Sequence, residues 1–424
     1  MRRLSPLKIA FFGLIGLVSI LPSNSRADLE TDSHGCVEME VWDVTRQMCL
    51  ALPMSGMPMS MFMLHGYLFG VHVWEQGPRG RDAWAGPSMI MTESGTSIGD
   101  RQYLNLELML AVDKWTFPDR GNPLFGQIGE NDAQGVPFLD AQHPHSSPVM
   151  GLTLSDTIKL DSGDKDYLKP FFAPRGASTD GPIAFMHRRT GEVNPDAPLG
   201  HHVGQDVGHI SSTVIGASWR RSSMIYEVST FNGKEPNPES IDLPIAAPDS
   251  FGMRMIREFS PTFTAMASFG YVHSPEPTEP EIGYLLRYSV SGYHEIKLSD
   301  GWTFYNSLIL GATTQMDHAQ SLGSFSEEFL FSGDRPNIWG RVEVLQRTPE
   351  ELQIPSTSPA TGKWIEATTL GYMHTLVRYE EAILGLGGSV TKTLMPGDFI
   401  GAYGGDPWSG KVFVRLSGMK MWGM

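Results

Sequence analysis

One short segment constrains the fold of this chain more than any other feature. In residues 103–113 every even position is apolar, whereas the odd positions include Asn105, Glu107 and Asp113. Because successive side chains of a strand point to opposite faces, this segment predicts a β-strand with one apolar and one wet face. A series of such segments in an exported chain is typical of a membrane β-barrel.

The N-terminus has the pattern of an export signal. A basic start is followed by an apolar core at residues 9–21 and by a small-x-small sequence that ends at Ala27. This predicts a cleaved signal peptide at residues 1–27. An uncleaved anchor helix is the alternative, but spanning a bilayer takes about 20 apolar residues. No later segment is long and apolar enough for a transmembrane helix, so a membrane form must be a closed sheet.

Strand-like runs separated by turn signals continue along the rest of the chain. We count about 12 to 16 of them, for example 59–75, 363–378 and 409–422. Short turns alternate with four long connections, at residues 115–146, 175–207, 233–248 and 348–362. This predicts an all-β fold, an antiparallel transmembrane β-barrel over residues 59–424, after an N-terminal Met- and Cys-containing segment at residues 28–58. A soluble sandwich with the apolar face as its core is the alternative. The export signal, the strand number and the lack of a domain boundary favour the membrane form.

Charged residues fit the same alternation. Arg287, Arg341, Glu343 and Arg415 each occupy the polar face of a predicted strand, so we expect them to line the lumen while their apolar neighbours face lipid. Tryptophans near strand ends fit interfacial girdles. The formal net charge of -15 argues against nucleic acid as a partner, because phosphate binding needs basic surface.

The two cysteines, Cys36 and Cys49, both lie near the mature N-terminus. In an oxidising compartment such a pair predicts one disulfide that closes a small loop. A thiolate metal site is the alternative.

A run of methionines precedes the first predicted strand. It comprises Met54, Met57, Met59, Met61 and Met63, and His65 follows. Thioethers are soft ligands that select Cu(I), so the run is a candidate copper site. The alternative is packing, because the last four methionines share one face if the segment is extended.

Histidines form a second candidate metal site, in the long connections. His143 and His145 make a His-x-His pair, and a later stretch contains His187, His201, His202, Asp206 and His209. Imidazole and carboxylate together suit Zn, Cu(II), Ni or Fe. Neither spacing matches the helical pair of a zinc protease. Surface-loop histidines that bind nothing are the alternative.

Catalytic signatures are weak in this sequence. It contains no nucleophile elbow, phosphate loop or dinucleotide fingerprint. Ser146-Ser147 and Ser211-Ser212 lie near histidines, which leaves an outer-membrane hydrolase open as an alternative. We predict a protein that is not an enzyme.

Several motifs together resemble a poorly characterised family of exported, β-rich bacterial proteins that accompany copper or heavy-metal resistance functions. The resemblance rests on residues 181–188, 198–202, 205–206, 209–210 and 231–236. It implies export and an association with metals, and it carries no mechanism or ligand set.

These observations predict an outer-membrane β-barrel that binds or passes transition-metal ions, with copper first. In this hypothesis the methionine run holds Cu(I), the histidines hold a divalent ion, and the lumen charges set the local field. The partners are the bilayer and a metal ion or small solute. A general porin-like or structural outer-membrane protein without a metal role is the rival. The sequence leaves the strand number, oligomeric state, loop sidedness and openness of the pore undetermined.

Overall fold

The structure is a computed structural model. It describes residues 40–44, 47–51, 60–132, 134–145, 147–160, 166–235, 241, 243, 245–273, 283–299, 301–316, 320–355 and 361–423. The predicted signal peptide, Met54, Met57, Met59 and Cys36 lie outside these residues, as does the side chain of Cys49. The predicted disulfide therefore stays a prediction.

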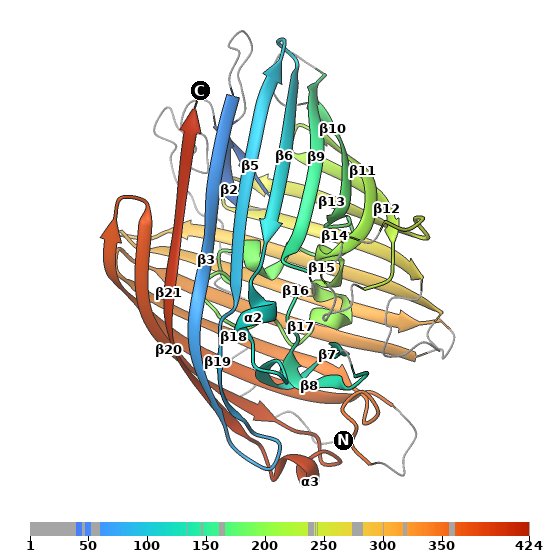
Figure 1. The fold of residues 1–424 in the computed structure, drawn as a ribbon, viewed down its shortest axis with the longest axis vertical. Coiled ribbons are helices and arrows are strands. Elements are labelled where there is room, and N and C mark those ends of the chain that lie inside the picture. Colours follow the sequence, from blue (N-terminus) through green and yellow to red (C-terminus); the bar gives the residue numbers. More distant parts are fainter. Residues whose placement is uncertain are drawn as a thin grey trace.

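A closed antiparallel barrel of sixteen strands forms the body of the molecule (Figure 1). Each strand pairs with the next along the chain, and β21 pairs with β3 to close the ring. The first return strand has two pieces, β4 and β5, which both pair with β3. This confirms the predicted fold class, with a strand number at the top of the predicted range.

The barrel strands are β3 (Ser60–Glu75), β4 (Asp82–Ala85), β5 (Ser88–Ile98), β6 (Gln102–Leu110), β9 (Val149–Lys159), β10 (Asp166–Gly176), β11 (Ser211–Arg221), β12 (Met224–Asn232), β13 (Ser250–Ser260), β14 (Phe263–His273), β15 (Tyr284–Lys297), β16 (Thr303–Gln315), β17 (Gln320–Ser332), β18 (Pro336–Arg347), β19 (Lys363–Tyr379), β20 (Ala382–Leu394) and β21 (Trp408–Gly423).

Smaller elements lie before and between these strands. They are the hairpins β1 (Glu40–Asp43) with β2 (Met48–Ala51) and β7 (Asn122–Asn131) with β8 (Pro137–Gln142), the helices α2 (Asp113–Thr116) and α3 (Ile400–Tyr403), and the short turns η1 (Phe185–His187), η2 (His201–Gln205) and η3 (Val207–His209). None of the helices in the described ranges has the length and hydropathy needed to cross a bilayer.

The two ends of the barrel differ in their connections. One end has tight turns, such as those between β19 and β20 and between β13 and β14. The other end carries the long connections, including residues 111–148 and 177–210. The first barrel strand begins and the last one ends at the short-turn end. This asymmetry is that of outer-membrane barrels, in which the short turns face the periplasm.

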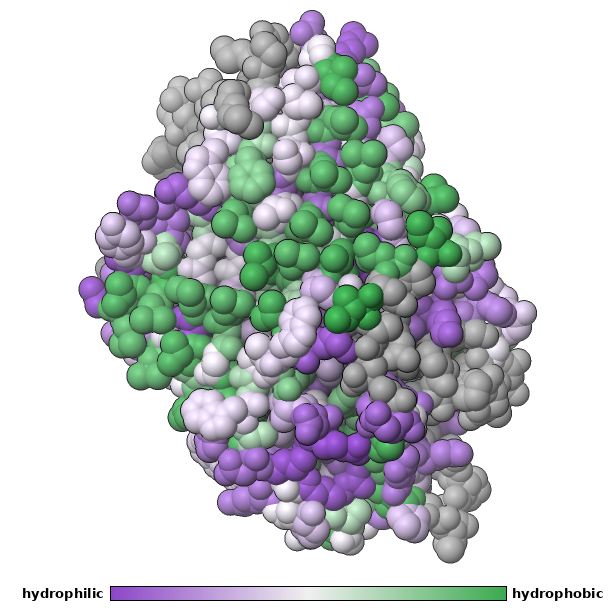
Figure 2. Space-filling model, viewed as in Figure 1, coloured by the Kyte–Doolittle hydropathy of each residue, from purple (hydrophilic) through white to green (hydrophobic). Residues whose placement is uncertain are grey.

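An apolar belt covers the outer wall. On β21 the exposed fractions of Val412, Val414 and Leu416 are 48%, 45% and 47%, whereas Lys411 and Arg415 between them are buried. Figure 2 shows the belt crossing the middle of the wall, with hydrophilic residues gathered at the long-connection end. Such a surface suits the hydrocarbon layer of a bilayer, and large exposed apolar areas of this kind are rare on soluble monomers.

We expect Leu370→Arg to destabilise the barrel by about 2–4 kcal/mol, because Leu370 lies at the middle of β19 with 60% of its surface exposed. Trp364→Arg, near the end of the same strand, should cost no more than about 1 kcal/mol. Urea unfolding in lipid vesicles measures both. Equal costs at the two positions would contradict the proposed depth of the strand.

The connection between β10 and β11 folds back into the lumen instead of extending outward. We call residues 178–209 the plug segment. In Figure 1 it lies within the ring of strands, where η1 to η3 are drawn in green. Its apolar residues Phe185 and Met186 belong to the same buried cluster as Phe69, Trp339 and Phe413 of the barrel wall. The lumen is therefore packed where these residues of the segment meet the wall.

Buried charged residues of the barrel wall hold the plug segment in place through hydrogen bonds and ion pairs. Arg188 donates to both oxygens of Glu328 on β17, from Nη2 over 2.8 Å and from Nε over 3.0 Å. The Thr190 hydroxyl donates to the same carboxylate over 2.6 Å. Lys411 on β21 pairs with Asp196. Charge-assisted bonds of this kind satisfy ions that would otherwise be costly to bury.

The four lumen charges singled out in the sequence all contact or approach this segment. Arg341 donates to the backbone oxygens of Asp196 and Ala197, and Glu343 accepts from the Leu199 N–H over 2.6 Å. Arg287 lies 3.4 Å from Asp180, and Arg415 lies 4.0 Å from Glu192. These charges therefore face the plug segment inside the lumen, where they contact its protein groups.

Candidate metal centre in the lumen

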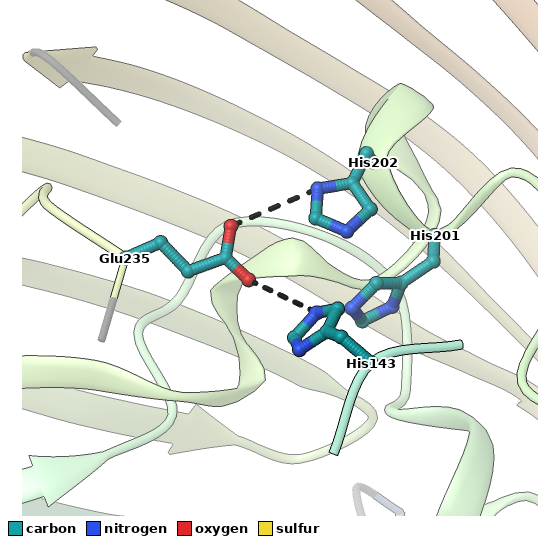
Figure 3. A group of neighbouring side chains, drawn as sticks. All are labelled: His143, His201, His202 and Glu235. Carbon is teal, nitrogen blue, oxygen red and sulfur yellow. Dashed lines mark ion pairs between the residues drawn. The ribbon is translucent and has the colours of Figure 1, made fainter. Parts of the chain in front are cut away.

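Four residues from three different connections converge at the long-connection half of the lumen (Figure 3). They are His143, His201, His202 and Glu235, and their ligand atoms all lie within 4.8 Å of one another. The Glu235 carboxylate lies between two imidazoles, 3.6 Å from His143 Nε2 and 3.7 Å from His202 Nδ1. Three imidazoles and one carboxylate form a ligand set for a divalent transition metal.

A distorted turn positions the two adjacent histidines. In η2 the backbone leaves helical geometry at Val203 and reaches φ 70° at Gly204. A Cβ at Gly204 would lie 2.5 Å from the backbone nitrogen of Ala312 on β16, so this close approach to the wall requires glycine. The Ser324 hydroxyl donates to the Val203 carbonyl over 2.6 Å and holds the same turn against β17.

A second group adjoins the first. His201, Asp206 and His209 also have ligand atoms within 4.8 Å of one another. His145 approaches from the connection between β6 and β9, and its Nε2 lies 3.4 Å from His209 Nε2. Asp206 accepts from the Phe185 N–H over 2.9 Å, which fixes its carboxylate within the plug segment.

The centre is buried, and burial sets its protonation. Burial and the neighbouring imidazoles lower the pKa of His201 well below its usual range. Burial and His145 lower the pKa of His209 to about 3, and burial raises the pKa of Asp206 to about 8. Both imidazoles are therefore neutral near pH 7, which is the form that binds metals. A cation beside Asp206 would favour its charged form.

Space for an ion exists between these side chains. A cavity of about 20 Å³ is lined by His143, His145, His201, His209 and Glu235. This volume holds one water molecule or a bare ion and excludes a larger solute.

Comparison with known proteins gives the fold and no family. No protein-family model and no curated protein matches the chain. Among solved structures, it is similar to OmpF of Salmonella typhi in complex with daunomycin, with a TM-score of 0.52, 11% identity, and coverage of 85% of this chain and 97% of that one. It is also similar to an anion-selective porin from Comamonas acidovorans, with a TM-score of 0.52, 12% identity, and coverage of 85% and 100%. The chain is an outer-membrane β-barrel.

Other predicted ligands of this barrel lie apart from the centre. Met61, Met63 and His65 face the lumen on β3 and are buried. His65 and His187 line a separate cavity of about 530 Å³ near the short-turn end. The structure therefore divides the predicted ligands into a histidine centre, a methionine strand and this cavity.

Two residues of the centre were not predicted from the sequence, one as a metal ligand and one as a support for a ligand. Glu235 follows β12 in a motif noted only for its resemblance, and a lone glutamate in a loop carries no metal signal. Asp113 ends the alternating run of residues 103–113, and in the structure its carboxylate lies 2.7 Å from His145 Nδ1. A histidine–carboxylate contact between residues 32 positions apart in one connection has no local signature.

Two of the serines near the histidines, Ser147 and Ser211, have other contacts. The Ser147 hydroxyl accepts from the Val149 N–H over 3.2 Å, and the Ser211 hydroxyl lies 3.5 Å from that of Ser178. A hydrolase would need a serine hydroxyl within hydrogen-bond reach of its base. These contacts lend no support to the hydrolase alternative.

Proposed function

We propose that this outer-membrane barrel binds a transition-metal ion inside its lumen, at His143, His201, His202 and Glu235. The observation that carries the proposal is the convergence of two buried ligands, His201 and His202, and two partly buried ones, His143 and Glu235, from three connections within 4.8 Å. Bringing imidazoles together in a dry interior is costly unless a cation or a dense hydrogen-bond network offsets the cost.

Copper is the metal we propose first. Imidazole and carboxylate ligands bind Cu(II) more tightly than the other divalent first-row ions. The thioethers of Met61 and Met63 on β3 suit Cu(I), so the lumen offers ligands for both oxidation states. The resemblance to exported proteins that accompany metal resistance agrees with this choice.

Binding is the primary role in this proposal, and passage is secondary. The plug segment supplies two of the four ligands and is bonded to the wall by Arg188 and Glu328. An ion could cross only if this segment moved.

Metal titration of the purified mature protein in detergent tests the proposal. We expect wild type to bind Cu(II) at least about 100-fold more tightly than the triple variant His143→Ala, His201→Ala, His202→Ala. His294→Ala, which removes a buried histidine outside the centre, should bind like wild type. Equal affinity in wild type and the triple variant would contradict the proposal. Appreciable conductance of wild type in planar bilayers would favour the porin-like rival.

A further inference from the structure

A second pair of imidazoles in the centre is arranged for its own ion. His145 Nε2 and His209 Nε2 face each other over 3.4 Å. The rings are nearly perpendicular, with an interplanar angle of 89° and centroids 5.7 Å apart. The positions of the ring protons decide whether the two nitrogens at this contact attract or repel each other.

The partners of the two Nδ1 atoms indicate where the ring protons lie. His145 Nδ1 lies 2.7 Å from the Asp113 carboxylate, and His209 Nδ1 lies 2.6 Å from the Asp206 carbonyl oxygen. Carboxylate and carbonyl oxygens accept, so each histidine donates from Nδ1. In the tautomers with a single ring proton on Nδ1, both Nε2 atoms present lone pairs to each other.

Two facing lone pairs repel unless a proton or a cation lies between them. With metal–nitrogen bonds of about 2.0–2.1 Å, tetrahedral geometry places two ligand nitrogens about 3.3–3.4 Å apart. The observed nitrogen separation equals that of two ligands on one tetrahedral ion, and a tilt of the two rings, whose centroids lie 5.7 Å apart, would aim both nitrogens at it. The carboxylate behind His145 is the support that metal-bound histidines usually have.

Further ligands adjoin the pair. His201 Nδ1 is buried, has no hydrogen-bond partner within the described ranges, and lies 4.0 Å from the Asp206 carboxylate. The His201 and His209 rings lie 5.0 Å apart by their centroids. His201 also belongs to the group with His143 and Glu235, so it stands between two ligand sets.

We propose that the lumen centre holds two metal ions. One is bound by His143, His202 and Glu235. The other is bound between His145 and His209, with Asp206 as a further ligand and Asp113 as a positioning residue, and His201 lies between the two. This inference rests on the proposed function and adds to it a second site and a stoichiometry.

Metal content of the full mature chain, loaded with Cu(II) and passed through a desalting column, tests the inference. We expect two equivalents in wild type and in His294→Ala, and one equivalent in His145→Ala and in His202→Ala. Electron paramagnetic resonance should show spin-coupled copper in wild type and an isolated Cu(II) signal in each single-site variant.

A milder substitution provides a second test in case the alanine variants misfold. Ser88 donates to Asp113 from its N–H over 2.9 Å and from its hydroxyl over 2.8 Å, so the carboxylate is well held. Asp113→Asn should weaken the second equivalent by about 10–100-fold and leave the affinity of the first unchanged. Heat-modifiable gel migration verifies that each variant is folded.

The outcomes separate the two proposals. One equivalent in wild type, lost in His202→Ala and retained in His145→Ala, would overturn the second site and leave the proposed function standing. No retained metal in wild type would overturn both.

Discussion

Deletion of the plug segment is expected to turn a closed barrel into a conducting one. Gly176 on β10 pairs directly with Ser211 on β11, so a short turn can replace residues 178–209 without a change of register. Barrels of sixteen strands leave an aqueous channel when nothing fills them. We therefore expect the deletion variant to show single-channel conductance at least about tenfold above wild type in planar bilayers.

A matched variant separates loss of the segment from loss of metal. The double variant His201→Ala, His202→Ala keeps the plug segment but removes ligands, and it should stay as closed as wild type. Heat-modifiable migration checks that both variants retain the barrel. A folded deletion variant with wild-type conductance would show that the lumen is closed by something other than residues 178–209.

Arg188→Ala is expected to release the plug segment from the wall. Arg188 and Glu328 are both at most 1% exposed, and the pair is bidentate. Removing one partner of a buried ion pair costs about 3–5 kcal/mol, because the other charge is left in the interior. Arg341 Nε still donates to Glu328 over 3.1 Å, so we expect the lower part of this range.

Hydrogen exchange measures this release locally. Backbone amides of the segment, such as that of Leu199, should lose protection by about 100-fold or more in Arg188→Ala, while amides of β19 keep theirs. The double variant Arg188→Met, Glu328→Gln should recover part of the loss, because it leaves no buried carboxylate without Arg188, and Arg341 keeps its bonds to the Asp196 and Ala197 carbonyl oxygens. Unchanged protection in Arg188→Ala would mean that packing alone holds the segment.

Alternation in the sequence was sufficient to predict the barrel wall. The predicted run 59–75 corresponds to Ser60–Glu75, and the predicted run 409–422 corresponds to Trp408–Gly423. Agreement is this close because each strand lies between lipid and the lumen, so every position has a defined face and the period of two persists along the strand. The sequence could not give the filled lumen.

The folding of the plug segment into the lumen could not be predicted from the sequence, because its structure depends on contacts with residues far away in the chain. Residues 175–207 were predicted only as a long connection, rich in Pro, Gly, Asn and Asp. Its contacts, such as Arg188 with Glu328 and Leu199 with Glu343, join residues more than a hundred positions apart. No local periodicity records such contacts. The same reason explains why β7 and β8 were not anticipated within residues 115–146.

The residue types of the candidate site could be predicted from the sequence, but the way in which these residues come together in space could not. His201, His202, Asp206 and His209 lie close in sequence, and one turn brings them together. Their meeting with His143, His145 and Glu235 depends on three connections that enter one half of the lumen. The methionine run points to the same chemistry, yet Met61 and Met63 lie on β3 and not in the centre.

The most direct measurement is a crystal structure of the copper-loaded protein with diffraction data collected at the copper absorption edge. We expect an anomalous difference peak within bonding distance of His143, His202 and Glu235, and a second one between His145 and His209. A fully occupied peak elsewhere with none in the lumen centre, or no peak in a fully loaded crystal, would contradict this expectation.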